Sequence, residues 1–114
     1  MKRRLSLRPQ IIDREVAHYP GLYFLMGTDS DPVRYIGQTD DLNVVLHQWA
    51  EKMAETREYR YFSFDYEDDA YQRFRRFCDL YHYHRESQFR LDNDEHPQRP
   101  EGTDWTCGHC DYGG

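Results

Sequence analysis

The hydrophobic residues between positions 21 and 66 change their spacing several times, and each change predicts a new element. Residues 21–26 form an unbroken apolar and aromatic run, which is typical of a buried strand. Residues 27–32 are rich in turn-forming types, and residues 33–38 then resume a strand-like pattern. Two short strands joined by a polar loop of this length favour an antiparallel hairpin.

A long helix is predicted directly after the hairpin. Thr39, Asp40 and Asp41 offer side-chain oxygens and negative charge where the free amides of a helix start need them. The hydrophobic residues that follow recur every three or four positions, so they share one helix face. They are Leu42, Val45, Leu46, Trp49 and Met53.

The same two patterns then occur again. Residues 59–66 alternate as a strand requires, and acidic residues 67–69 precede a second helical run that ends near His84. Before the hairpin, residues 9–18 fit a short helix with Pro9 in its first turn. We therefore predict an α+β fold of order β-β-α-β-α, in which helices flank a three-stranded, mainly antiparallel sheet. Residues 1–18 would be an N-terminal extension, 19–85 the domain, and 86–114 an irregular C-terminal tail with a CxxC motif.

Composition narrows the possible partners and the compartment. The 114 residues are 16% aromatic, which predicts one aromatic-rich core. The formal net charge of -6 works against non-specific attraction to nucleic acid. No apolar stretch is long enough for a signal peptide or a membrane span, so we expect a cytoplasmic protein without a membrane partner. Three cysteines in a reducing compartment predict no disulfide framework.

Two triplets occur in order on the two predicted hairpin strands. They are Gly-Leu-Tyr at 21–23 and Tyr-Ile-Gly at 35–37, and Asp-Leu at 41–42 follows at the start of the first long helix. Together they resemble the GIY-YIG nuclease family over residues 19–84. The resemblance implies that Tyr23 and Tyr35 flank a reacting phosphate. It also implies an Arg on the first long helix to neutralise charge and a Glu on the later helix to hold a divalent cation such as Mg²⁺.

The charges that this resemblance requires are absent from the matching positions. Val45 occupies the place of the Arg, Trp49 that of a His, and Phe74 that of the Glu. Loss of one charged transition-state contact costs a factor of about 10² to 10³ in rate, and loss of the metal ligand weakens the binding of the metal ion. We therefore predict a catalytically degenerate domain that binds a protein or a nucleic acid. Tyr23, Tyr35 and Gly37 would be vestigial catalytic positions.

The alternative is a metal-dependent endonuclease whose Arg and Glu roles have moved elsewhere. Arg34 precedes Tyr35, His47 lies two residues after Val45, and acidic residues gather at 65–69. Arg34 and His47 would then bind substrate, and Mg²⁺ would be the cofactor. These positions also have simpler interpretations, because acidic residues at a helix start usually stabilise the helix dipole.

The C-terminal tail contains half of a metal-binding pattern. Cys107 and Cys110 have the two-residue gap that lets both thiolates reach one tetrahedral Zn²⁺. The missing ligands would be histidines from the second long helix or the tail, namely His82, His84 or His96. Such a site would pin the tail to that helix, so a zinc-stabilised interaction module is a further hypothesis. Cys78 is predicted to pack as a small hydrophobe.

Overall fold

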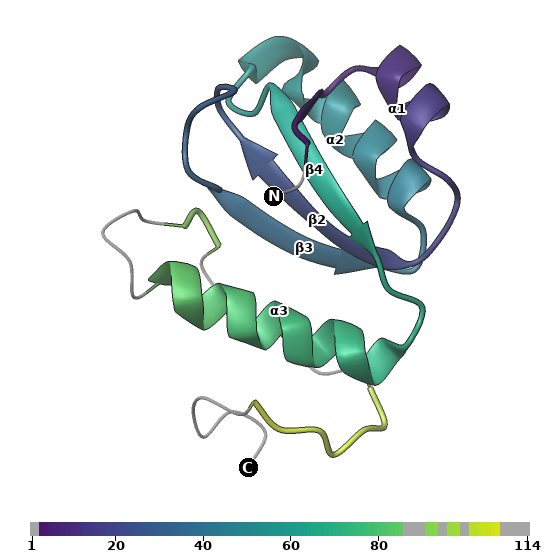
Figure 1. Ribbon diagram of the computed structural model, residues 1–114, viewed down its shortest axis with the longest axis vertical. Helices are drawn as coiled ribbons and strands as arrows, with labels where there is room; N and C mark the ends of the chain where they lie inside the picture. The colour runs from purple at the N-terminus through teal and green to yellow at the C-terminus, as the bar shows by residue number, and fades with distance from the viewer. Residues whose placement is uncertain (1–2, 86–90, 94–95, 99–100, 108–114) are drawn as a thin grey trace.

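A four-stranded antiparallel sheet lies between helices on both of its faces (Figure 1). The computed structural model describes residues 3–85, 91–93, 96–98 and 101–107. The elements in chain order are β1 (Leu5–Ser6), α1 (Pro9–Glu15), β2 (Gly21–Met26), β3 (Tyr35–Thr39), α2 (Leu42–Thr56), β4 (Tyr61–Tyr66) and α3 (Ala70–Arg85). The strands are arranged in the order β1-β4-β2-β3, so this is an α+β domain.

The prediction of three strands is wrong by one strand. The additional strand, β1, pairs with β4 through Leu5 opposite Phe62 and Ser6 opposite Tyr61. It contains two residues, which is too short for an alternating pattern to be recognised in the sequence. The predicted β2-β3 hairpin is confirmed, with Tyr23 directly opposite Gly37.

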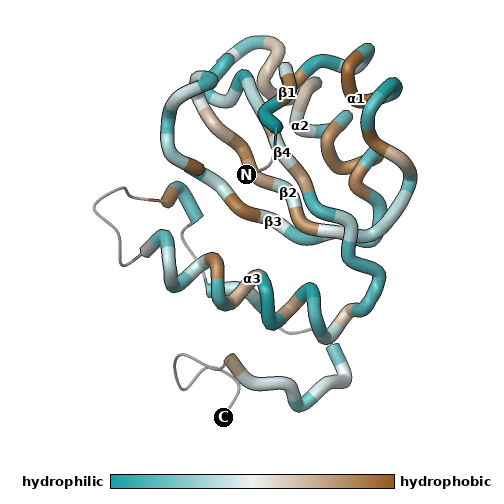
Figure 2. Tube along the Cα trace, in the orientation of Figure 1, coloured by the Kyte–Doolittle hydropathy of each residue, from teal (hydrophilic) through white to brown (hydrophobic). Residues whose placement is uncertain are grey.

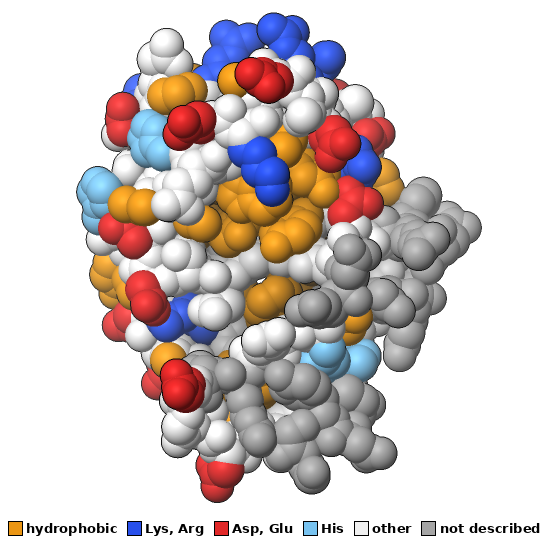
Figure 3. Space-filling model, turned by 180° about the vertical axis from the view of Figure 1, so that it is seen from behind, with side chains coloured by type: hydrophobic (Ala, Val, Ile, Leu, Met, Phe, Trp, Pro, Cys, Tyr) orange, Lys and Arg blue, Asp and Glu red, His pale blue; other side chains and the backbone are white. Residues whose placement is uncertain are grey.

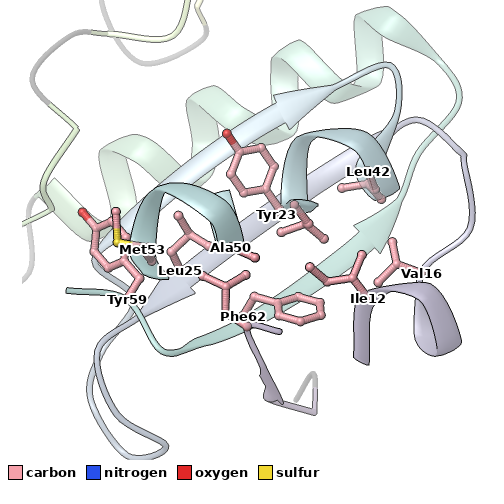
Figure 4. Close-up of a cluster of buried hydrophobic side chains, with 11 residues drawn as sticks. Ile12, Val16, Tyr23, Leu25, Leu42, Ala50, Met53, Tyr59 and Phe62 are labelled. Carbon is pink, nitrogen blue, oxygen red and sulfur yellow. The ribbon is translucent and has the colours of Figure 1, made fainter. Parts of the chain in front are cut away.

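The central strand β2 divides the core into two layers, because successive side chains on a strand point to opposite faces. Tyr23 and Leu25 pack with α1 and α2, as Figure 4 shows. Leu22, Phe24 and Met26 pack on the other face with residues of α3. Every residue of β2 is buried. Figure 2 shows that hydrophobic residues recur in β2 and in all three helices.

The start of α2 confirms the predicted cap. The Asp41 carboxylate accepts a hydrogen bond from the Val44 amide at 3.1 Å, which satisfies one of the free donors at the helix start. His18 Nδ1 lies 2.9 Å from the same carboxylate. This hydrogen bond, together with the one from Val44, lowers the pKa of Asp41. The helix ends at Thr56, and the next residue, Arg57, adopts the left-handed conformation with φ 54°.

Residues 91–93 cover the outer edge of β3. The Asn93 side chain accepts a hydrogen bond from the Ile36 amide at 2.9 Å and donates one to the Ile36 carbonyl at 2.8 Å. The Asp92 amide donates to the Arg34 carbonyl at 2.6 Å. An uncovered strand edge would present unpaired backbone groups to other chains. This part of the tail therefore completes the domain although it has no regular secondary structure.

In the described part of the chain, no helix combines the length and the apolar character needed to cross a membrane.

Candidate functional site

The two motif tyrosines lie on neighbouring strands of the hairpin, on the face covered by α2. Tyr23 is 5% exposed, and its ring crosses β3 directly over Gly37. A Cβ atom at position 37 would overlap the ring and the hydroxyl of Tyr23. Gly37 is therefore needed for the close approach of an aromatic ring to the backbone.

The Tyr23 hydroxyl is engaged by Trp49, a residue of α2. The indole Nε1 of Trp49 donates a hydrogen bond to the Tyr23 hydroxyl at 3.1 Å. The Tyr35 ring lies 5.0 Å from the Trp49 ring and 6.3 Å from the Tyr23 ring. Burial is the main cause that raises the pKa of Tyr23 to about 12, so its hydroxyl is neutral at physiological pH. The position at which the resemblance implies a histidine thus holds an aromatic side chain that binds the motif tyrosine.

The other two substituted positions also pack as hydrophobic residues. Val45 is partly buried against the same core layer as Tyr23. Phe74 lies on α3 and packs with Cys78, Cys107 and Trp105, in a cluster separate from the Tyr23 layer. A carboxylate at position 74 would therefore project into the contact between α3 and the tail.

Arg34 and His47, the predicted substrate-binding residues, both have structural partners. Arg34 Nη2 pairs with Asp92 at 3.0 Å, and its guanidinium carbon lies 5.2 Å from the Tyr59 ring centroid. His47 Nε2 lies 2.8 Å from an Asp13 carboxylate oxygen, so it links α2 to α1. Neither side chain is directed at the Tyr23 hydroxyl by any of these contacts.

The acidic residues before α3 also serve the fold. Asp65 and Glu67 pair with Arg76 at 3.0 and 3.5 Å. Asp69 accepts a hydrogen bond from the Gln72 amide at 2.9 Å, as a helix cap does. Among the described residues, these carboxylates do not converge into a group of three that could hold a metal ion.

Arg73, near the start of α3, is a buried cation. Its side chain is 7% exposed and donates to Gln38 Oε1, the Glu67 carbonyl and Asp40 Oδ1 at 3.3, 3.0 and 2.9 Å. These bonds attach the start of α3 to the end of β3. An Arg beside a core residue such as Phe74 gives no signal in the sequence that it is buried.

A second cluster of chemically reactive side chains lies between α3 and the tail. The ligand atoms of Cys78, His96 and Cys107 all lie within 4.8 Å of one another. The structure thus brings together two of the predicted zinc ligands, His96 and Cys107, and adds Cys78, which the sequence reasoning had assigned to packing. The predicted ligand Cys110 lies outside the described residues. His84 is not part of this cluster, and burial lowers its pKa.

A pocket of about 580 Å³ opens where β1, the end of α2 and the start of β4 meet. Its lining includes three arginines, Arg8, Arg57 and Arg60, and one carboxylate, Asp29. All three arginines are exposed, and no salt bridge joins them to another residue of the described ranges. Figure 3 shows basic side chains gathered at the end of the molecule where α2 ends. The sequence did not predict this pocket, because Arg8 is far from Arg57 and Arg60 in the chain.

Comparison with known proteins found no match to a family model, to a curated protein or to a solved structure. The GIY-YIG assignment therefore stays a prediction from residues 21–23 and 35–37.

Proposed function

We propose that this protein is a non-catalytic binding module on a GIY-YIG-like scaffold. The hydrogen bond from Trp49 Nε1 to the Tyr23 hydroxyl is the observation that carries the proposal. A phosphodiesterase needs cationic groups or a metal ion beside the reacting phosphate, where negative charge develops. Here the motif tyrosine is buried and contacts an indole instead.

The contacts of Arg34 and His47, the residues to which catalytic roles could have moved, support the same conclusion. To act on a phosphate, Arg34 would have to leave Asp92 and the Tyr59 ring, and His47 would have to leave Asp13. Catalysis depends on groups held in productive geometry, and these contacts hold both side chains in other positions. Purified protein with Mg²⁺ or Mn²⁺ is therefore expected to leave DNA intact.

The pocket lined by Arg8, Arg57 and Arg60 is the binding surface of this proposal. Buried apolar residues, including Leu7, Met53 and Tyr59, contribute to its lining beside the exposed cations. This combination suits a protein segment that carries carboxylates next to an apolar side chain. The net charge of -6 disfavours the longer polyanion of a nucleic acid, so an acidic protein segment is the proposed partner.

Fluorescence anisotropy with a fluorescein-labelled peptide rich in Asp, Glu and Leu tests this binding function. The double variant Arg57→Glu with Arg60→Glu should weaken binding at least tenfold, or about 1.4 kcal/mol. The control is Arg14→Glu, because Arg14 is exposed on α1 and does not line the pocket. Equal binding of a peptide with Asn and Gln in place of Asp and Glu would contradict the proposal. Tighter binding of a DNA duplex would instead favour a nucleic-acid partner.

A further inference from the structure

We propose that Cys78, His96 and Cys107 hold a structural Zn²⁺ ion that fastens the described part of the tail to α3. This inference goes beyond the binding function and does not depend on it. It assigns Cys78, a residue on the apolar face of a helix, as a metal ligand. It also selects His96 from the predicted alternatives His82, His84 and His96.

The separations of the three described ligands fit one zinc ion. Zn–S bonds of about 2.3 Å and Zn–N bonds of about 2.0 Å place the ligand atoms of a tetrahedral site about 3.5 to 3.8 Å apart. The ligand atoms of Cys78, His96 and Cys107 lie within 4.8 Å of one another, so small side-chain rotations bring them to this geometry. Cys78 is 0% and Cys107 is 5% exposed, which is typical of an enclosed structural site rather than an open catalytic one.

The ring of His96 is oriented for metal binding by its other contacts. Its Nδ1 lies 2.8 Å from the Pro97 carbonyl oxygen, and a carbonyl can only accept, so Nδ1 carries the proton. Nε2 is then the nitrogen with a lone pair, as metal-binding histidines require. The rings of Tyr81 and His82 pack against His96 at centroid distances of 5.3 and 5.2 Å and restrict its rotation.

Cys110 lies outside the described residues, and as a fourth ligand it stays a prediction from spacing in the sequence. Cys110 comes three residues after Cys107, and this C-x₂-C spacing lets both sulfurs bind one ion. The donor set would then be three thiolates and one imidazole, a common set for structural zinc. Thiolates favour zinc over magnesium or calcium, which prefer oxygen ligands.

The proposed ion would join three segments that are distant in the sequence. Cys78 belongs to α3, while His96 and Cys107 lie in the tail, and Figure 1 shows the segment ending at Cys107 running beside α3. Trp105 packs there against Tyr71 and Phe74 at centroid distances of 5.1 and 6.1 Å. Zinc binding would therefore hold Trp105 against the helix, which makes its fluorescence a reporter of the site.

Elemental analysis of protein purified without chelator tests the assignment directly. We expect one zinc ion per chain, and we expect Cys78→Ser, His96→Asn and Cys107→Ser each to lower the zinc content several-fold. His84→Asn is the matched control and should retain the ion. Replacement of zinc by Co²⁺ should give a thiolate-to-cobalt charge-transfer band and the intense visible bands of a tetrahedral ion. A full zinc content in Cys78→Ser, or loss of zinc in His84→Asn, overturns the assignment.

A measurement on the unchanged chain covers the case in which a variant fails to fold. A strong chelator should shift the tryptophan emission of the wild-type protein to longer wavelength, and added zinc should reverse the shift. The Trp105→Phe protein should lose this response. An unchanged emission spectrum, or a Cys78–Cys107 disulfide in freshly purified zinc-free protein, contradicts the proposal.

Discussion

Replacing Gly37 by Ala tests how closely Tyr23 approaches the backbone of β3. The added methyl group would occupy the space of the Tyr23 ring and hydroxyl, and Tyr23 is 5% exposed and enclosed by the core. The ring must therefore move, which also breaks its hydrogen bond with Trp49 Nε1. The substitution adds no polar group, so its effect reports the displacement of the Tyr23 ring and the loss of its hydrogen bond.

The expected destabilisation by this substitution has two contributions. Overpacking of a well-filled core costs about 2 kcal/mol, and a lost hydrogen bond costs about 1 kcal/mol. For a domain of this size, the resulting loss of about 3 kcal/mol lowers the melting temperature by about 12 °C. Urea unfolding followed by circular dichroism measures the free energy, and a thermal scan measures the melting temperature.

A double-mutant cycle with Tyr23→Leu separates this contact from other effects of the Ala side chain. Leu lacks the ring that the new methyl group would meet, so Gly37→Ala should cost less than about 1 kcal/mol in that background. Tyr23→Phe keeps the ring and should keep most of the cost. An equal cost of Gly37→Ala in the wild-type and Tyr23→Leu backgrounds would refute the reasoning.

Three further predictions test other contacts. Asn93→Ala should lower the free energy of unfolding by about 2 kcal/mol in urea titrations, because the amide and carbonyl of Ile36 lose their partner. An effect below about 0.5 kcal/mol would contradict the contact between Asn93 and the edge of β3. Arg73→Ala should cost about 2 kcal/mol in the same assay. Asp40→Asn should cost less than about 1 kcal/mol, because the Asp40 side chain is 93% exposed. Equal costs of the two substitutions would contradict the burial of Arg73. Burial raises the pKa of Tyr23 from 10.0 to about 12, so the folded chain keeps a proton that the unfolded chain loses in this range. This contribution to stability is complete below pH 10 and falls by up to about 1.4 kcal/mol per pH unit towards pH 12, and Tyr23→Phe should flatten that slope.

The elements that the sequence predicted are those with enough residues to show a period. β2 is a continuous hydrophobic strand of six residues, and α2 repeats its apolar positions over 15 residues. β1 contains two residues and becomes a strand only because β4 offers it an unpaired edge. Such tertiary pairing leaves no local pattern in the sequence.

The tail was the least predictable region for a related reason. Asn93 is an ordinary polar residue in an irregular segment, yet its amide is buried against Ile36 and replaces strand pairing at the edge of β3. Side chain to backbone contacts across 57 residues follow from the folded path of the chain and not from composition.

For the candidate site, the sequence predicted which charged residues are missing but not which contacts replace them. The identities of Val45, Trp49 and Phe74 already indicated missing charges. The hydrogen bond between Trp49 and Tyr23 required the three-dimensional structure, because it joins α2 to β2. Cys78 was ambiguous for a chemical reason, since a thiol on an apolar helix face can be a packing group or a metal ligand.

The most direct test of the central claim is a cleavage assay with supercoiled plasmid, excess protein and either Mg²⁺ or Mn²⁺. The Tyr35→Phe protein, prepared in parallel, distinguishes the protein's own activity from a contaminating nuclease. Trp49 donates a hydrogen bond to the Tyr23 hydroxyl, and no group of three carboxylates that could hold a metal ion occurs in the described ranges. We therefore expect no nicked or linear product from either protein. Metal-dependent nicking by the wild-type protein that disappears in Tyr35→Phe would contradict the account.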